Sequence, residues 1–216
     1  AEPLIEWAHG HGAWVHVDGA FGLWALACQP YAHLAAGYQT ADSWATDAHK
    51  WLNVRYDSGI ALVADGDALR QAMSISGAYI APSSRRDAID VTPDSSRRSR
   101  AIELWAALKS LGRSGLSQLI ERNCRQAEKL AAGLRQAGFE ILNDVVLNQI
   151  IVAFGDDACT GKTITAIQDE GTCWCSGTLW QGRAAMRVSF SSWATTDSDV
   201  DRTLSAIIRT ARSVAD

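Results

Sequence analysis

Short apolar runs bounded by glycine or polar residues recur in the first third of the chain. They cover residues 13–17, 43–46 and 59–64. Such runs, partly β-branched or aromatic, are typical of strands buried inside a sheet. Residues 2–9 have the pattern of a helix that ends at Gly10. Because the segments between the runs are long enough for crossover connections, the pattern predicts a parallel sheet with helices on its faces, an α/β fold.

The second half of the chain has helical spacing interrupted by further short runs. Apolar residues recur every three or four positions, and the runs between them alternate or are β-branched. Thr196, with Asp199 three residues later, approximates a capping box at the start of the last helix. The predicted order is helices 101–111 and 114–137, strands 139–142 and 149–154, helix 160–170, a hairpin of strands 173–180 and 184–190, and a helix from 196. This half is therefore predicted to be α+β.

Residues 83–100 separate the two halves and lack an apolar pattern. The segment holds five serines, five arginines, three aspartates and one proline. Loops this long are typically functional lids, and the alternative is a solvated connection between domains. We expect a domain boundary here, with residues 1–98 in a first domain and 99–216 in a second.

Composition narrows the class of protein. The 216 residues carry a formal net charge of −4 and are 47% hydrophobic, as in an ordinary globular protein. A nucleic-acid partner is not expected, because phosphate neutralisation needs clustered Lys and Arg. The apolar stretches are too short to cross a bilayer and the start of the chain does not resemble a signal peptide, so we expect no membrane association and a cytoplasmic location.

Cysteines and histidines do not form a strong metal motif. Five unevenly spaced cysteines predict free cytosolic thiols rather than disulfides. The spacing of Cys173 and Cys175 is shorter than structural zinc sites use. His9, His11 and His16 precede Asp18, which leaves a metal-hydrolase reading open, although the first two also fit a solvated turn. We expect no metal site.

Chemistry-bearing residues follow two of the predicted strands. Ligands of an open parallel sheet bind beyond the carboxyl ends of its strands. Asp18 and Ala20 follow the first run, and His49 and Lys50 follow the second. A lysine amine can form an imine with an aldehyde, and a carboxylate can hold a proton on a heterocyclic nitrogen. Pyridoxal phosphate needs both groups. Alternatively, Asp18 caps the following helix and Lys50 is a surface lysine.

Several motifs resemble one known family. Residues 16–21 (HVDGAF) and 41–52 (ADSWATDAHKWL) resemble the signature of the group II pyridoxal-phosphate-dependent amino-acid decarboxylases, which act on aromatic amino acids, histidine, tyrosine or glutamate. Residues 96–105 (SRRSRAIELW) and 186–190 (MRVSF) resemble later segments of that family. The likeness runs through the chain in the right order. It implies the aspartate-aminotransferase-like fold (fold type I of pyridoxal-phosphate enzymes), here the end of the large, mainly parallel sheet domain and a small α+β domain.

The resemblance also implies roles for individual residues. Lys50 would form the imine with pyridoxal phosphate, and Asp18 would pair with the pyridine nitrogen. Ala20 would pack on the face of the cofactor ring, and His49 would lie near the cofactor as a further catalytic group. Arg187 stands where fold relatives often bind the substrate carboxylate, although a structural salt bridge is an equal alternative for it.

Departures from the family pattern open alternatives. Asp47 replaces an Asn of many members, and an Asp facing the phosphate would repel it, so Asp47 is expected to contact something else. The loop 83–100 lacks the Tyr that reprotonates the substrate carbon in the family, and Tyr79 matches a different position. The family's first half, which supplies most phosphate-binding groups, has no counterpart, so the chain resembles the C-terminal half of a subunit.

Three functions follow from the resemblance and its departures. The first is a carboxy-lyase that releases CO2 and an amine from an L-amino acid as its small-molecule substrate, as a homodimer when the subunit is whole. The second is an aldehyde synthase or aminotransferase with the same cofactor. The third, from another class, is an inactive fragment that acts only as a folded interaction module.

Overall fold

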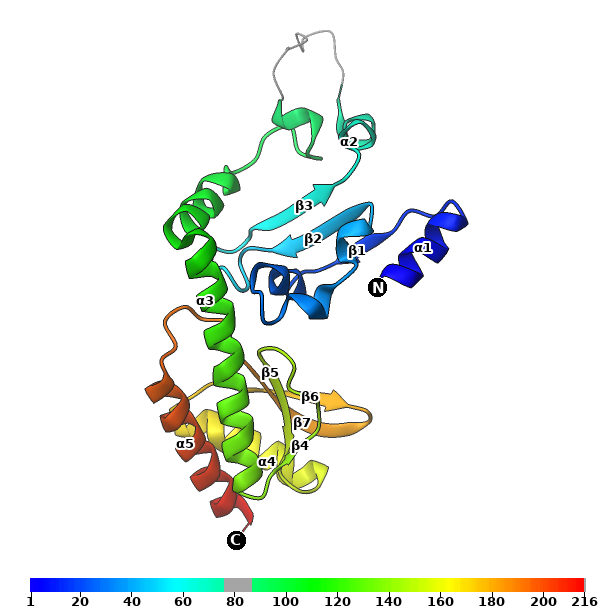
Figure 1. Ribbon diagram of the computed structural model, residues 1–216. Coiled ribbons are helices and arrows are strands. Elements are labelled where there is room, and N and C mark those ends of the chain that lie inside the picture. Colours follow the sequence, from blue (N-terminus) through cyan, green and yellow to red (C-terminus); the bar gives the residue numbers. More distant parts are fainter. Residues whose placement is uncertain (76–86, 216) are drawn as a thin grey trace. The chain divides into compact units, whose positions relative to one another are not determined.

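Helix α3 (Arg100–Gln136) joins two units of the chain, Ala1–Arg113 and Ser114–Asp216 (Figure 1). The computed structural model describes residues 1–75 and 87–215. Inside α3, Gly112 has φ 61° and ψ −176°, a conformation open essentially to glycine alone. The helix is therefore two segments, as the separate patterns over 101–111 and 114–137 predict. The predicted domain boundary at 98/99 precedes α3, whereas the two units divide next to Gly112.

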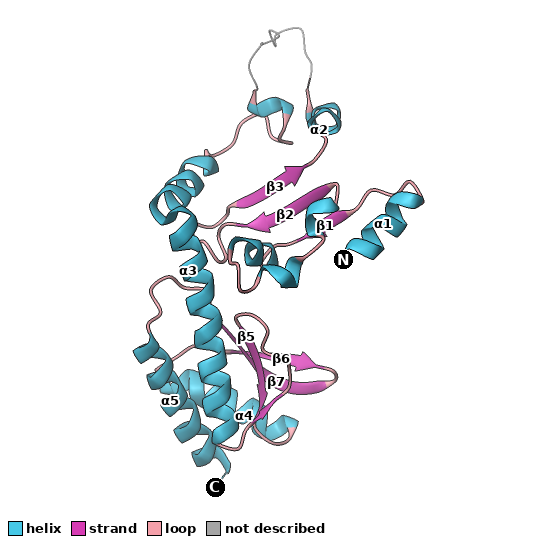
Figure 2. Cartoon of the chain, in the orientation of Figure 1, coloured by secondary structure: helices cyan, strands magenta, loops and turns pink. Residues whose placement is uncertain are grey.

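The first unit holds a three-stranded mixed sheet in the order β1-β2-β3 (Figure 2). Its strands are β1 (His16–Asp18), β2 (Ser43–Asp47) and β3 (Gly59–Val63). β1 runs parallel to β2, as predicted, but β3 runs antiparallel to β2. The expectation of a third parallel strand is wrong because residues 48–58 are too few for a crossover, which takes about a dozen residues or more.

β1 starts later than the apolar run predicts. Val15 does not join the sheet ladder; its N–H donates to Asp42 Oδ2 at 2.6 Å. Trp14 is exposed, and its indole N–H donates to Ser43 Oγ at 2.8 Å. Side-chain acceptors on the neighbouring segment thus help to hold residues 14 and 15, together with the Val15 carbonyl, which accepts the N–H groups of Asp42 at 3.0 Å and Ser43 at 3.3 Å.

Short helices complete the first unit around a small core. They are α1 (Glu2–Gly10), α2 (Gly66–Met73) and the 3-10 turns Gly22–Ala27, Ala32–Ala35, Tyr38–Thr40 and Ala88–Asp90. The apolar pattern does not predict α2, which starts because Asp65 Oδ1 accepts the N–H groups of Asp67 and Ala68. Trp51 is fully buried and its ring lies 4.7 Å from that of Phe21.

The predicted loop 83–100 is described from residue 87 onward; residues 83–86 and Tyr79 lie outside the described residues. Its second part is fastened by arginines. Arg100 donates to both carboxylate oxygens of Asp57, and Arg98 donates to the Asp57 carbonyl and to Glu103. The Arg100 guanidinium lowers the pKa of the Asp57 carboxyl below its usual value.

The second unit packs three helices on an antiparallel sheet of order β4-β5-β7-β6 (Figure 2). Its elements after α3 are β4 (Glu140–Ile141), β5 (Gln149–Ala153), α4 (Asp157–Glu170), β6 (Ser176–Trp180), β7 (Arg183–Ser189) and α5 (Asp197–Ala215). Every helix and the two central strands contribute to one core that includes Leu130, Ile150, Ile167, Met186 and Ile207. The predicted α+β organisation and the β6–β7 hairpin are confirmed.

Capping explains where the last two helices begin. The Asp199 carboxylate accepts from the N–H and hydroxyl of Thr196, and Thr196 Oγ1 accepts from Asp199 N–H, so the predicted capping box forms at α5. α4 starts before the predicted Thr160, because Asp156 Oδ1 accepts the N–H of Cys159. No helix within residues 1–75 or 87–215 is long and apolar enough to span a membrane.

Candidate functional site

The ends of β1 and β2 lie at one edge of the sheet in the first unit. Asp18 is the last residue of β1 and pairs in register with Ala45 of β2. Backbone bonds continue the pairing beyond the strand: Gly19 N–H donates to Ala45 O at 2.8 Å, and Asp47 N–H donates to Ala20 O at 3.0 Å. The parallel arrangement therefore brings the segment of Asp18 and Ala20 beside Asp47, as the sequence predicts.

Gly19 allows the chain to turn closely at this edge. A Cβ atom at this position would lie 2.6 Å from Leu23 Cβ and 3.2 Å from the carbonyl oxygen of Ala45. Real Cβ atoms do not approach a neighbouring carbon so closely. Only glycine fits between the two segments without moving one of them.

Asp18 carries an exposed carboxylate at the strand end. Its Oδ1 accepts the N–H of Ala20 at 3.1 Å, which orients the side chain along the loop. The alternative role as a helix cap is not seen, because the next helical turn has Phe21 at its N-cap and no side-chain capping bond. The carboxylate is thus accessible to a ligand at this edge.

Asp47 and Lys50 form an ion pair just beyond β2. Lys50 Nζ lies 2.9 Å from Asp47 Oδ2, and the two side chains are 42% and 25% exposed. His49 Nε2 lies 3.8 Å from the same oxygen. Asp47 is expected to contact something other than a phosphate, and the structure shows that its contact is the Lys50 amine.

His49 is held by the backbone of Ser58. The N–H of Ser58 points at Nδ1 across 3.1 Å, while the Ser58 carbonyl already accepts the N–H of Ala48 at 2.8 Å. Nδ1 also lies 3.1 Å from the Ser58 carbonyl oxygen, so the Ser58 backbone holds this side of the ring and Nε2 faces Asp47. The ring of Tyr56 contacts the imidazole edge-on at 4.5 Å. Sequence patterns missed Ser58 and Tyr56, because no local motif links them to His49.

Arg187 belongs to the second unit and lies on β7. It is exposed, and in register it stands between Ile151 of β5 and Ser176 of β6. No ion pair involves Arg187 within the part of the chain that the structure describes. Neither the carboxylate contact nor the salt bridge is tested by this, so both roles of Arg187 stay predictions.

The residues considered for a metal have other partners. His9 Nε2 lies 2.9 Å from Asp42, and His16 Nδ1 lies 2.8 Å from Ser43 Oγ. Burial, followed by the neighbouring Cys173, raises the pKa of the Cys175 thiol to about 11, so it resists the deprotonation that metal binding requires. Among the described residues, no three His, Cys, Asp or Glu side chains group as metal ligands.

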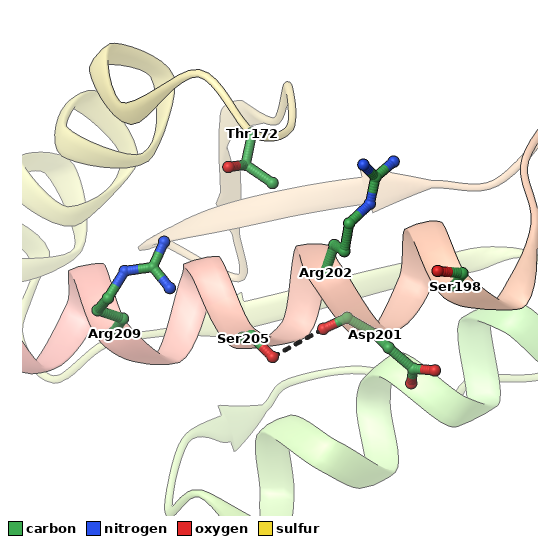
Figure 3. A pocket seen from close by; sticks show the side chains of 6 residues that line it. All are labelled: Thr172, Ser198, Asp201, Arg202, Ser205 and Arg209. Carbon is green, nitrogen blue, oxygen red and sulfur yellow. Dashed lines mark hydrogen bonds between the residues drawn. The ribbon is translucent and has the colours of Figure 1, made fainter.

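A polar hollow of about 500 Å³ lies on α5 in the second unit (Figure 3). Its two arginines already have acidic partners: Arg209 bonds Glu170 at 2.7 Å, and Arg202 pairs with Asp199. Ser205 donates to the carbonyl of Asp201 across 2.9 Å. These internal bonds occupy both arginines and Ser205 of the hollow.

Comparison with known proteins assigns the family. The profile of the pyridoxal-dependent decarboxylase conserved domain matches residues 2–154, which include Asp18, Ala20, His49 and Lys50. The chain belongs to the pyridoxal-dependent decarboxylase family. Its members depend on pyridoxal, so the family resemblance and the cofactor class expected from the sequence are confirmed.

Individual decarboxylase-family relatives agree over most of the chain. Histidine decarboxylase of Drosophila melanogaster is 29% identical over 195 residues, 88% of this chain and 23% of the relative. Phenylacetaldehyde synthase of Arabidopsis thaliana is 26% identical over 207 residues, 89% of this chain and 42% of the relative. The chain thus spans less than half the length of these relatives.

Solved structures confirm the fold. The crystal structure of Oryza sativa TDC with PLP and tryptamine superimposes with a TM-score of 0.92, at 20% identity, over all of this chain and 48% of that one. The decarboxylase-family chain accordingly has the aspartate-aminotransferase-like fold, with a mixed sheet in the first unit and an α+β second unit.

The residues at the β1–β2 edge fit the family cofactor chemically. An accessible carboxylate on Asp18 and a primary amine on Lys50 stand at adjacent strand ends, with the small side chain of Ala20 on the segment between them. These are the groups that a pyridine nitrogen and an aldehyde require.

Proposed function

We propose that this chain is part of a pyridoxal-phosphate-dependent L-amino-acid decarboxylase, a carboxy-lyase that releases CO2 and an amine. The observation that carries the proposal is the placement of Asp18 and Lys50 at neighbouring ends of the parallel strands β1 and β2, in a chain of this family. The chain spans about half of the TDC chain it superimposes on. The activity is therefore proposed for the protein that contains this segment.

Each residue of the edge has a task in the proposal. Lys50 binds the aldehyde carbon through Nζ, and Asp18 holds a proton on the pyridine nitrogen. Ala20 would offer a small apolar surface to one ring face, and His49, whose Nε2 lies 3.8 Å from Asp47 Oδ2, would be a further catalytic group near the cofactor. Bound pyridoxal phosphate supplies the electron sink that accepts the electron pair left by the departing CO2.

Arg187 is proposed, more loosely, as a contact of the substrate carboxylate. Its support is an exposed guanidinium with no ion pair among the described residues, flanked in register by Ser176. A carboxylate that must leave as CO2 needs freedom from a strong clamp. An aminotransferase keeps the substrate carboxylate, so a firm contact from Arg187 would suit it better than a decarboxylase. Arg187 therefore also bears on the second candidate.

The second candidate is an aldehyde synthase or an aminotransferase. An aldehyde synthase is among the relatives, and residues 83–100 contain no Tyr to return a proton to the substrate carbon. Product analysis separates the candidates. CO2 with a stable amine supports the decarboxylase; aldehyde with ammonia identifies the synthase, and a keto acid identifies the aminotransferase.

We further propose that the whole protein is a cytoplasmic homodimer whose small-molecule substrate is an amino acid. Cys28, Cys159, Cys173 and Cys175 are free thiols, as is usual in a reducing compartment. The dimer rests on the resemblance to the family. Size-exclusion chromatography with light scattering of the protein that contains this chain tests it, and a monomeric active enzyme would contradict it.

The test of the cofactor site is chemical trapping. The 216-residue chain is titrated with pyridoxal phosphate, reduced with borohydride and digested for mass spectrometry. We expect weak binding and a reduced adduct on Lys50, which Lys50→Ala removes and the control Lys162→Ala does not. In the protein that contains this chain, absence of an adduct on Lys50, or equal labelling of all lysines, would refute the site; if so, the remaining candidate is a folded module without catalysis.

A further inference from the structure

Asp47 contacts the amine that the proposed function assigns to the cofactor. Its Oδ2 lies 2.9 Å from Lys50 Nζ and 3.8 Å from His49 Nε2. A carboxylate at this distance commits the amine to an ion pair. An asparagine at this position would contact Lys50 without a negative charge.

We infer that Asp47 is a positioning residue that restrains Lys50 until a ligand aldehyde displaces it. This inference rests on the proposed function and deepens it. The 2.9 Å contact holds Lys50 Nζ at the Asp47 carboxylate, so the nitrogen reaches another carbon only when the pair opens. When the pair opens, the nitrogen bonds the aldehyde carbon, the carbonyl oxygen leaves as water with two protons of the ammonium group, and one proton stays on the new C=N nitrogen.

The Asp47 carboxylate is not needed to hold the strand edge together, because the Asp47 backbone makes the hydrogen bonds to the neighbouring segment. The N–H of Asp47 donates to Ala20 O at 3.0 Å, and its carbonyl accepts the indole N–H of Trp24 at 3.4 Å. Neither bond involves the carboxylate, which is 25% exposed. Replacing the carboxylate by an amide should therefore leave the strand edge folded.

The second unit contains a matched reference pair. Lys129 Nζ lies 2.6 Å from Asp201 Oδ1, and Lys129 is 42% exposed, the same fraction as Lys50. Lys109 and Lys162 complete the set of lysines in the chain. Each lysine thus serves as an internal standard for the others.

The experiment is competitive acetylation of the 216-residue chain with limiting acetic anhydride at neutral pH, read by mass spectrometry. Asp47→Asn should raise the labelling rate of Lys50 about two- to fivefold relative to Lys109, the range expected for loss of a partly exposed ion pair. Asp201→Asn should raise Lys129 and leave Lys50 unchanged. Asp47→Glu, which keeps the charge, should leave Lys50 near its original rate.

Unchanged or slower labelling of Lys50 in Asp47→Asn, with Lys129 responding to Asp201→Asn, would overturn the inference. Circular dichroism of each variant shows that the comparison is made between folded chains. The readout is independent of pyridoxal phosphate. Faster labelling in Asp47→Asn combined with no borohydride-trapped adduct would uphold the restraint on Lys50 and refute the proposed function, so the two failures are distinguishable.

Discussion

Gly19 sits where the two strand ends that carry Asp18 and Asp47 come closest. The surrounding contacts are backbone bonds, with Gly19 N–H donating to Ala45 O and Ala20 O accepting from Asp47 N–H. The Asp18 side chain at this edge accepts one bond, from the Ala20 N–H. A small shift of the loop would therefore displace the acidic groups of the candidate site together.

Gly19→Ala is expected to destabilise the chain by about 1–3 kcal/mol, because its methyl group overlaps Leu23 and crowds Ala45. Gly22→Ala is the control. A Cβ at Gly22 meets nothing within 4 Å, so the free energy of unfolding should change by no more than about 1 kcal/mol. Urea denaturation of both variants measures the difference. Equal stability of the two variants would contradict the close approach at Gly19.

Whole elements in this chain begin where a side chain caps them. The first turn of α5 is fixed by the reciprocal bonds of Thr196 and Asp199. The hydroxyl of Thr196, then its backbone N–H and the guanidinium of Arg202, lower the pKa of Asp199 to about 2. Because the unfolded carboxyl titrates near 3.9, ionisation of Asp199 favours the folded state.

The contribution of Asp199 should depend on pH in one direction. A lowered folded-state pKa gives stability that is complete above the unfolded value near 3.9 and is lost as pH falls toward about 2. The free energies of unfolding of the parent and of Asp199→Ala should therefore converge between pH 5 and about 2. Thermal or urea melts across this range measure the convergence.

The Thr196→Ala background is the control for this titration. Without the hydroxyl donor, the effect of Asp199→Ala should be smaller and its pH dependence weaker, as a double-mutant cycle would show. A constant difference between parent and variant from pH 6 to pH 2 would contradict the capping role of the carboxylate.

At the scale of the whole molecule, the second unit has a core of its own. Helices α3, α4 and α5 and strands β5 and β7 supply its buried side chains, among them Leu134, which is fully buried. The break at Gly112 separates the part of α3 in this unit from the part in the first. A single core with its own sheet and helices is the requirement for independent folding.

Residues 114–216 expressed alone should therefore give a cooperative unfolding transition. Within this fragment, Leu134→Ala should cost about 2–5 kcal/mol through the cavity that it leaves. Leu179→Ala is the control, because Leu179 is 74% exposed and should change stability by no more than about 0.5 kcal/mol. A fragment without a cooperative transition, or equal effects of the two variants, would show that the second unit depends on the first.

Local periodicity was sufficient for much of the fold. Helical spacing predicts both segments of α3 and the body of α5, and the capping box at Thr196 is visible as residue types three positions apart. It could not predict the direction of β3, since strand direction depends on how the chain returns and not on which residues are apolar. It also missed α2, whose start depends on a cap at Asp65.

For the candidate site, the sequence alone determined the chemical groups, their order and, through the family motif, the cofactor class. Asp18 and Lys50 are recognisable because each follows a predicted strand. Only the tertiary structure decided that Asp47 faces Lys50 and that Ser58 orients His49. These contacts depend on the path of the turn after β2. The distance of 2.9 Å between Asp47 Oδ2 and Lys50 Nζ follows from that path and not from the spacing of the two residues along the chain.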